Sequence, residues 1–175
     1  MKPICGLVVY AVCMGLVMTG SAKTAQAADK ANYSGKYSLQ ERKATSGSET
    51  DSTLEVVQKE DGIEVTRVEQ GRRTTSLCPL NGTEGDYMSP GGVAGKCKAE
   101  LKGKYLILES VVVARPQLTA PPVRMHTKER WQLSPDSKTL TIRSDVDFPD
   151  YPAEVSAAVA PSTSRTQKYT RTENP

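Results

Sequence analysis

One histidine and a few carboxylates are the residues of this sequence whose types could carry catalysis. A nucleophilic triad needs a base, a nucleophile and a group that orients the base. The single histidine, His126, has no serine or cysteine in a recognisable relation to it. Glu100, Glu109 and Glu129 could supply the paired carboxylates of a glycosidase, but glutamate is also common on the outward faces of strands. We therefore predict a non-enzymatic protein, with a hydrolase that uses His126 as the alternative.

Asp145, Asp147 and Asp150 lie close together near the end of an apolar segment. Carboxylate oxygens are the ligands that calcium prefers, so the three aspartates form a candidate calcium site. Pro149 and Pro152 indicate a solvated turn instead, and the spacing of an EF-hand is absent. A zinc site needs three or four histidine, cysteine or acidic ligands, and the sequence does not offer such a set. We predict no cofactor.

The four cysteines of the sequence fall into two pairs. Cys5 and Cys13 lie in the apolar N-terminal stretch, whereas Cys78 and Cys97 lie in the body of the chain. An even pair in an oxidising compartment is most simply a disulfide. The segment that Cys78 and Cys97 would close is rich in proline and glycine, and closing about 20 residues stabilises a fold by roughly 3 kcal/mol.

Residues 1–27 have the three parts of a cleavable secretory signal peptide. Lys2 gives the positive start, an apolar stretch of about 15 residues follows, and Ala25-Gln26-Ala27 matches the small-x-small cleavage pattern. A membrane-spanning helix needs roughly 20 apolar residues, so we predict cleavage after Ala27 and no membrane span afterwards. A lipoprotein signal that uses Cys13 is the alternative.

Loss of residues 1–27 changes the charge of the chain. The segment carries two lysines and no acid, so the formal charge falls from +3 to +1 in residues 28–175. Nucleic-acid binding needs a clustered excess of lysine and arginine, and we therefore predict no nucleic-acid partner. Export leads either to a periplasm or to the medium, and the sequence leaves both open.

Residues 28–175 contain a series of short β-rich segments and almost no helical periodicity. Residues 96–101 alternate between apolar and charged side chains, which is the period of a half-buried strand. Weak helical turns are possible only in the alanine-rich segment 150–161. The nine predicted strands are residues 37–43, 54–59, 63–70, 72–78, 96–101, 105–114, 125–133, 139–146 and 167–172.

Turn signals separate these strands at hairpin spacing. Asp61-Gly62 predicts a tight hairpin, because glycine accepts the positive φ that such turns require. Lys102-Gly103-Lys104 and Ser134-Pro135-Asp136-Ser137 predict two more hairpins. Residues 115–122 hold three prolines and are predicted to be a loop.

Sequential hairpins of this kind predict a single all-β domain over residues 28–175. We expect an antiparallel meander barrel of about 8–10 strands, because closure of the sheet removes its exposed edges. A β-sandwich is the alternative architecture.

Two features resemble the lipocalin-like (calycin) barrels. Gly35-Lys36-Tyr37 opens the first strand, where that superfamily often has Gly-x-Trp, and Arg171 lies in the last strand, where the family often has a basic residue. The resemblance implies that Arg171 packs over the ring of Tyr37 and closes one end of the barrel. Residues 131–140 also resemble the hairpins of uncharacterised bacterial secreted proteins.

We therefore predict a secreted or periplasmic barrel that binds a small apolar or amphipathic ligand, unless side chains fill its interior. A cell-envelope protein-interaction or inhibitor domain that uses the disulfide-closed segment 78–97 is the alternative. The predicted pocket consists of Tyr37, Val56, Ile63, Val65, Leu106, Leu108, Trp131, Leu133, Leu140 and Ile142.

Overall fold

The structure is a computed structural model that describes residues 31–42, 52–115, 122–150 and 163–173. The predicted signal peptide, residues 1–27, lies outside the described residues, and so does nearly all of the alanine-rich segment 150–161. The regular structure within the described ranges consists of strands alone. No helix in those ranges is long and apolar enough to cross a membrane.

Ten strands follow one another in the described part of the chain. They are β1 (Gly35–Arg42), β2 (Ser52–Gln58), β3 (Gly62–Glu69), β4 (Arg72–Pro79), β5 (Gly85–Met88), β6 (Ala94–Lys102), β7 (Tyr105–Ala114), β8 (Val123–Leu133), β9 (Thr139–Asp147) and β10 (Thr163–Glu173).

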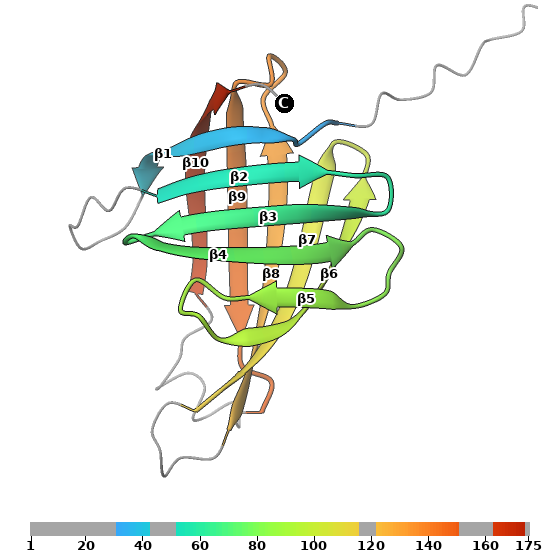
Figure 1. The fold of residues 1–175 in the computed structure, drawn as a ribbon, viewed down its shortest axis with the longest axis vertical. Helices are drawn as coiled ribbons and strands as arrows, with labels where there is room; N and C mark the ends of the chain where they lie inside the picture. The colour runs from blue at the N-terminus through green and yellow to red at the C-terminus, as the bar shows by residue number, and fades with distance from the viewer. Residues whose placement is uncertain (1–30, 43–51, 116–121, 151–162, 174–175) are drawn as a thin grey trace, which may run out of the picture.

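The strands form one antiparallel sheet in the order β4-β3-β2-β1-β10-β9-β8-β7-β6-β5. Each strand pairs with its neighbours in sequence, except that β4 and β5 form the two edges, and the first strand also pairs with the last. Figure 1 shows β2–β5 crossing over β8–β10 at a steep angle, so that two layers face each other. The sheet curls until its two edge strands, β4 and β5, meet. The predicted meander barrel is confirmed, and the sandwich alternative is wrong.

The predicted hairpins are present, although one of them uses its glycine differently. The β2–β3 turn is closed by a hydrogen bond from Lys59 N to Gly62 O of 2.8 Å. Gly62 itself starts β3 and has no left-handed backbone, so the expected positive φ there is wrong. The left-handed pair lies in the next turn, where Gln70 has φ 52° and Gly71 has φ 74°. Two such residues in succession match the right-handed twist of the flanking strands.

The segment between Cys78 and Cys97 contains a strand, β5, which a sequence rich in glycine and proline does not predict. β5 pairs with β6 through Gly85–Cys97 and Tyr87–Gly95. Tyr87 is the buried residue of β5, and the two residues on either side of it are more exposed. The sequence predicts no strand between residues 78 and 96, so β5 is missed, and about half of the segment is barrel wall.

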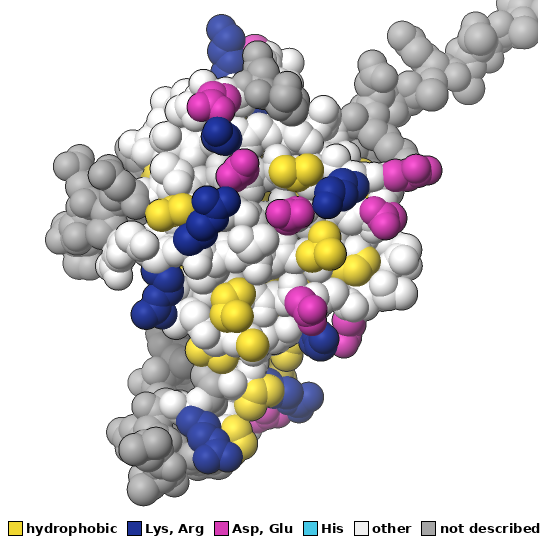
Figure 2. Space-filling model, in the orientation of Figure 1, with side chains coloured by type: hydrophobic (Ala, Val, Ile, Leu, Met, Phe, Trp, Pro, Cys, Tyr) yellow, Lys and Arg dark blue, Asp and Glu magenta, His cyan; other side chains and the backbone are white. Residues whose placement is uncertain are grey.

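The outer surface of the barrel carries both signs of charge. Figure 2 shows lysine, arginine, aspartate and glutamate side chains interspersed over β2–β4, with small hydrophobic groups between them. An ion pair of 3.5 Å between Arg73 of β4 and Glu55 of β2 spans the intervening strand β3 there. The face in this view has no extended field of a single sign.

Candidate functional site

Alternate residues of each strand face the interior of the barrel, and at one end they are apolar. Inward positions at this end come from both layers of the sheet. Trp131, Ile63, Leu106 and Leu140 are fully buried here, and Val56 is nearly so. They belong to one hydrophobic cluster, which is the core of the domain.

Toward the other end of the barrel the inward positions become polar. β2 changes from Val56 and Leu54 to Ser52, and β7 changes from Leu106 and Leu108 to Ser110, with all six side chains buried. The same change occurs on strands β3, β8, β9 and β10, which contribute Arg67, Glu129 with Thr127, Ser144 and Gln167. The interior therefore has a band of polar residues next to its apolar end, and the buried apolar residues Val112 of β7 and Val123 of β8 lie beyond that band.

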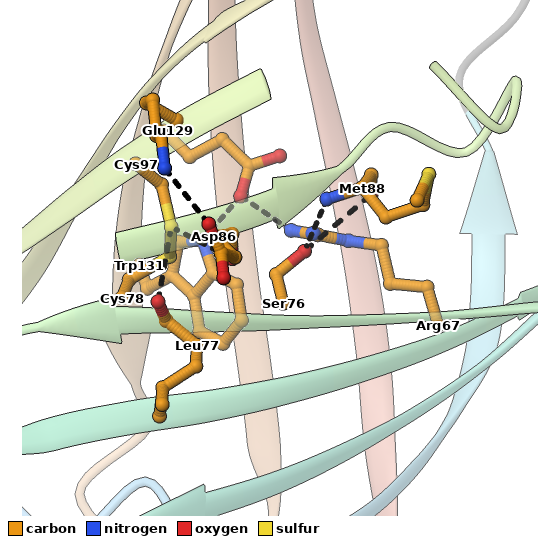
Figure 3. The surroundings of a disulfide bond; sticks show 10 residues. Arg67, Ser76, Leu77, Cys78, Asp86, Met88, Cys97, Glu129 and Trp131 are labelled. Atoms are coloured by element: carbon orange, nitrogen blue, oxygen red, sulfur yellow. Dashed lines mark hydrogen bonds and ion pairs between the residues drawn. A yellow bond between two sulfur atoms is a disulfide. The ribbon is translucent and has the colours of Figure 1, made fainter. Parts of the chain in front are cut away.

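An ion pair between the two layers marks the boundary between the apolar and the polar part. Arg67 of β3 donates from Nη2 to Glu129 Oε2 of β8 at 2.6 Å, and both side chains are about nine-tenths buried. The same carboxylate oxygen accepts a hydrogen bond of 2.9 Å from Trp131 Nε1. The Arg67 guanidinium also lies 5.7 Å from the centroid of the Trp131 ring. Figure 3 shows the Arg67 side chain pointing toward Glu129 and Trp131.

The electrostatics of this cluster keep it close to neutral overall. Burial alone would lower the pKa of Arg67, but the carboxylate of Glu129, together with Tyr87, Tyr169 and Glu69, more than offsets that effect and raises the pKa. The charges of Arg67 and Glu129 also act on the pKa values of the Tyr87 and Tyr169 phenols. Burial raises the pKa of both phenols and Arg67 opposes the rise, so both stay protonated at neutral pH. One buried cation and one buried anion thus compensate each other.

Two buried polar groups beside the ion pair have no partner among the described residues. They are Ser144 Oγ, on a fully buried residue of β9, and Gln167 Nε2, on a residue of β10 that is 4% exposed. Ser144 is directly opposite Glu129 in the β8–β9 ladder. Gln167 pairs with Ile142, so it lies diagonally next to Ser144 on the same face. Buried polar groups in folded proteins are nearly always hydrogen-bonded, and these two are available to another molecule.

Aromatic residues and an arginine close the apolar end of the barrel. The guanidinium of Arg171 lies 5.2 Å from the centroid of the Tyr37 ring, and its Nη2 donates to Tyr37 Oη at 2.6 Å. Tyr33 donates from its hydroxyl to Lys104 O at 2.8 Å and Trp131 O at 3.1 Å. Gly35 allows this closure, because a Cβ at its φ of 146° would contact the Arg171 side chain at 3.2 Å.

The disulfide closes the seam between the two edges of the sheet. Cys78 of β4 and Cys97 of β6 are bonded, with their Cα atoms 5.2 Å apart. No backbone ladder joins the described residues of β4 and β5. Ser76 Oγ accepts from Met88 N at 3.0 Å across this seam instead. The predicted disulfide is confirmed, and it links two strands of the wall directly.

The predicted pocket residues all lie in or against the core. Nine of them are buried, and Leu133 is partly buried and packs against that cluster. Val56, Ile63, Leu106, Trp131 and Leu140 belong to the apolar end, whereas Leu108 and Ile142 lie beside the polar groups. Sequence reasoning missed the polar half of the interior. The alternation of side chains along β3 could have revealed it. Arg67 is two residues from Val65 and four from Ile63, which both point inward, so Arg67 also points inward.

The residues considered for catalysis are not brought together. His126 Nδ1 lies 3.5 Å from Asp147 Oδ1 in a cross-strand pair on the outer surface. Glu109 accepts from Lys128 at 2.8 Å and pairs with Lys98 on the outer face, whereas Glu129 faces the interior. Glu109 and Glu129 therefore lie on opposite faces of the sheet and form no carboxylate pair.

The three aspartates of the candidate calcium site have separate partners. Asp150 binds the Arg124 guanidinium, Asp147 faces His126, and Asp145 lies 3.7 Å from Arg143. The Arg124 side chain holds the pKa of Asp150 below its usual value. Among the described residues, no group of three or more histidines, cysteines, aspartates or glutamates is arranged to hold a metal ion.

A groove of about 330 Å³ lies on the outer surface. Charged and apolar residues of β6, β7 and the segment after β4 line it: Leu80, Gly82, Lys98, Ala99, Glu100, Ile107 and Glu109. A second groove, of about 200 Å³, lies over β1–β4. Both grooves are outside the barrel, and neither contains the buried polar cluster.

A nearly closed antiparallel meander of this kind has the fold of a calycin-type β-barrel. Solved structures share this fold at low sequence identity. The zebrafish ileal bile acid-binding protein with cholic acid has a TM-score of 0.53 at 15% identity, covering 79% of this chain and 97% of that one. The "REP1-NXSQ fatty acid transporter" has a TM-score of 0.52 at 12% identity, covering 81% and 97%.

A secretory abundant heat soluble protein from Ramazzottius varieornatus also matches, with a TM-score of 0.52 at 12% identity over 80% of this chain and 95% of that one. No family model and no curated protein matches the sequence. Identities this low establish a common fold alone.

Proposed function

We propose that this protein is an exported, non-enzymatic barrel that binds a small apolar or amphipathic molecule in its interior. The observation that carries the proposal is the band of polar inward residues that adjoins the apolar end of the barrel. A ligand with an apolar body and a polar group matches a site with an apolar wall and a few convergent polar groups. The fold that this chain shares with a fatty acid transporter and a bile acid-binding protein supports the same function.

Trp131 makes this proposal easy to test, because it is the single tryptophan of the chain and is fully buried in the interior. A ligand that enters the barrel changes the surroundings of its ring. Titration with a fluorescent fatty-acid probe should quench Trp131 emission in a saturable way. Quenching that rises linearly up to the solubility limit of the probe would contradict the proposal.

Export into an oxidising compartment is the second part of the proposal. The Cys78–Cys97 bond supports it, because structural disulfides persist in extracellular and periplasmic proteins. The leader over residues 1–27 predicts that the exported form begins at Ala28. N-terminal sequencing of the protein recovered outside the cytoplasm tests this directly. A chain that starts at Met1 would contradict cleavage.

A further inference from the structure

We propose that the polar group of the ligand is uncharged and hydrogen-bonds to Ser144 and Gln167 beside the Arg67–Glu129 pair. This inference rests on the proposed function and names the chemical class of the ligand. It predicts a preference for an alcohol, an amide or an ester over a carboxylate carried on the same apolar chain.

The charge of the cluster is the first step. Arg67 is the buried cation of the interior, and a buried cation would ordinarily attract a ligand carboxylate. Here Glu129 already occupies that position, with its Oε2 2.6 Å from Arg67 Nη2. A second carboxylate next to the pair would be a buried charge without a counterion, which is strongly unfavourable. The phenols of Tyr87 and Tyr169 are neutral, and the next cation on that face, Arg165 opposite Ser144, is exposed to solvent.

The free hydrogen-bonding groups are the second step. Gln167 Nε2 is a donor, and Ser144 Oγ is both a donor and an acceptor. Neither has a partner within the described part of the chain. Both come from one face of β9 and β10, and diagonal neighbours on one face are about 7–8 Å apart, within reach of one small polar group. An oxygen atom that accepts from both of them would satisfy the two orphaned groups.

The position of these groups is the third step. Ile142 pairs with Gln167 on β10 and with Trp131 on β8, so the polar groups adjoin the apolar end directly. A ligand whose polar group contacts Gln167 can therefore extend its apolar chain toward Trp131 and Leu140. This places the polar group in the middle of the barrel and the apolar chain toward the end that Tyr37 and Arg171 close.

Three probes with matched chains test the inference. Decanamide, 1-decanol and decanoate are titrated into the purified protein at pH 8, where the acid is ionised, and Trp131 emission is followed. We expect decanamide and 1-decanol to bind at least about tenfold more tightly than decanoate. Equal or tighter binding of decanoate overturns the inference and leaves the proposed function standing. No saturable response to any probe overturns the proposed function itself.

Two variants of the polar groups locate the site. Gln167→Leu and Ser144→Ala should each weaken decanamide binding by roughly three- to tenfold, the usual cost of one lost hydrogen bond. Gln132→Leu is the matched control, because Gln132 lies on the outer face of β8 between two inward residues. Wild-type affinity in both folded interior variants overturns the assignment. Ser144→Ala alone decides the question if Gln167→Leu does not fold.

A third variant tests the charge argument. Glu129→Gln removes the negative charge of the pair and keeps an oxygen that accepts from Trp131. It leaves Arg67 as a buried cation without a counterion, so the preference should reverse toward decanoate. Thermal unfolding with each probe gives a second readout, and decanoate should raise the midpoint of this variant more than decanamide does. An unchanged preference for decanamide would overturn the charge argument.

Discussion

Gly85 of β5 lies directly against the carbonyl oxygen of Leu77 in β4, so closely that a Cβ atom at Gly85 would overlap it. This contact is where the two edges of the sheet meet. The Cys78–Cys97 bond crosses the seam beside it, because Gly85 is the partner of Cys97 in the β5–β6 ladder. Closure of the barrel thus depends on a residue without a side chain.

Gly85→Ala should therefore destabilise the barrel. The added methyl group has no space and forces β5 away from β4, which costs about 1–3 kcal/mol in an overpacked site. Chemical denaturation measures this loss. Gly91→Ala is the control, because a Cβ there meets only Ser89 Oγ at 3.8 Å. A loss for Gly85→Ala no greater than that for Gly91→Ala would show that β4 and β5 separate without cost.

The disulfide is expected to stabilise the same seam. Replacing both cysteines by alanine should lower the free energy of unfolding by roughly 3 kcal/mol, the value for a closed loop of this length. A reducing agent should lower the stability of the unmodified protein to the level of the variant and leave the variant unchanged. If reduction destabilises both proteins equally, the effect does not come from Cys78–Cys97.

Alternation of apolar side chains was enough to predict nine of the ten strands. It failed for β5, which has only four residues and one buried side chain, Tyr87. The pairing of β5 with β6 and its position beside the disulfide determine this strand. These are long-range contacts, and a local pattern of glycine and proline contains no information on them.

The polar half of the interior was not predictable for a related reason. A charged residue in a strand is ordinarily an outward residue, and Arg67 breaks that rule because its partner is Glu129, 62 residues further on. Only the register of both strands shows that the two side chains face each other. The apolar half, by contrast, follows from residues such as Ile63 and Trp131, whose type alone indicates the interior.

Breaking the Arg67–Glu129 pair from one side should be costly. Arg67→Met or Glu129→Gln leaves a buried charge without a counterion, at a cost of about 3–5 kcal/mol for each. The double variant should recover most of that loss, and a double-mutant cycle by chemical denaturation measures the coupling. The matched control is Lys36→Met with Glu173→Gln, because that pair is exposed to solvent and exposed ion pairs contribute little to stability.

The coupling energy distinguishes a buried pair from an exposed one. Strong coupling at Arg67–Glu129 and weak coupling at Lys36–Glu173 is the expected result. If the two cycles give the same energy, Arg67 and Glu129 are accessible to water in solution.

Alkaline pH should destabilise the closed end of the barrel through Tyr33. Burial raises the pKa of Tyr33 to about 12, whereas a tyrosine in the unfolded chain titrates near 10. Between these two values the folded protein holds a proton that the unfolded chain has lost. The contribution of Tyr33 is therefore complete below pH 10 and is lost as the pH rises through 12.

Urea denaturation at intervals from pH 8 to pH 12, with absorbance at 295 nm to follow the phenolates, measures this effect. Tyr33→Phe should lower stability at pH 8, because the hydrogen bonds to Lys104 O and Trp131 O are lost. Above pH 10 its stability should decline less steeply than that of the unmodified protein, since one phenol with a raised pKa is gone. The remaining decline comes from Tyr37, Tyr87 and Tyr169, whose pKa values burial also raises. Parallel declines for the two proteins would mean that the Tyr33 hydroxyl is hydrated in the folded state.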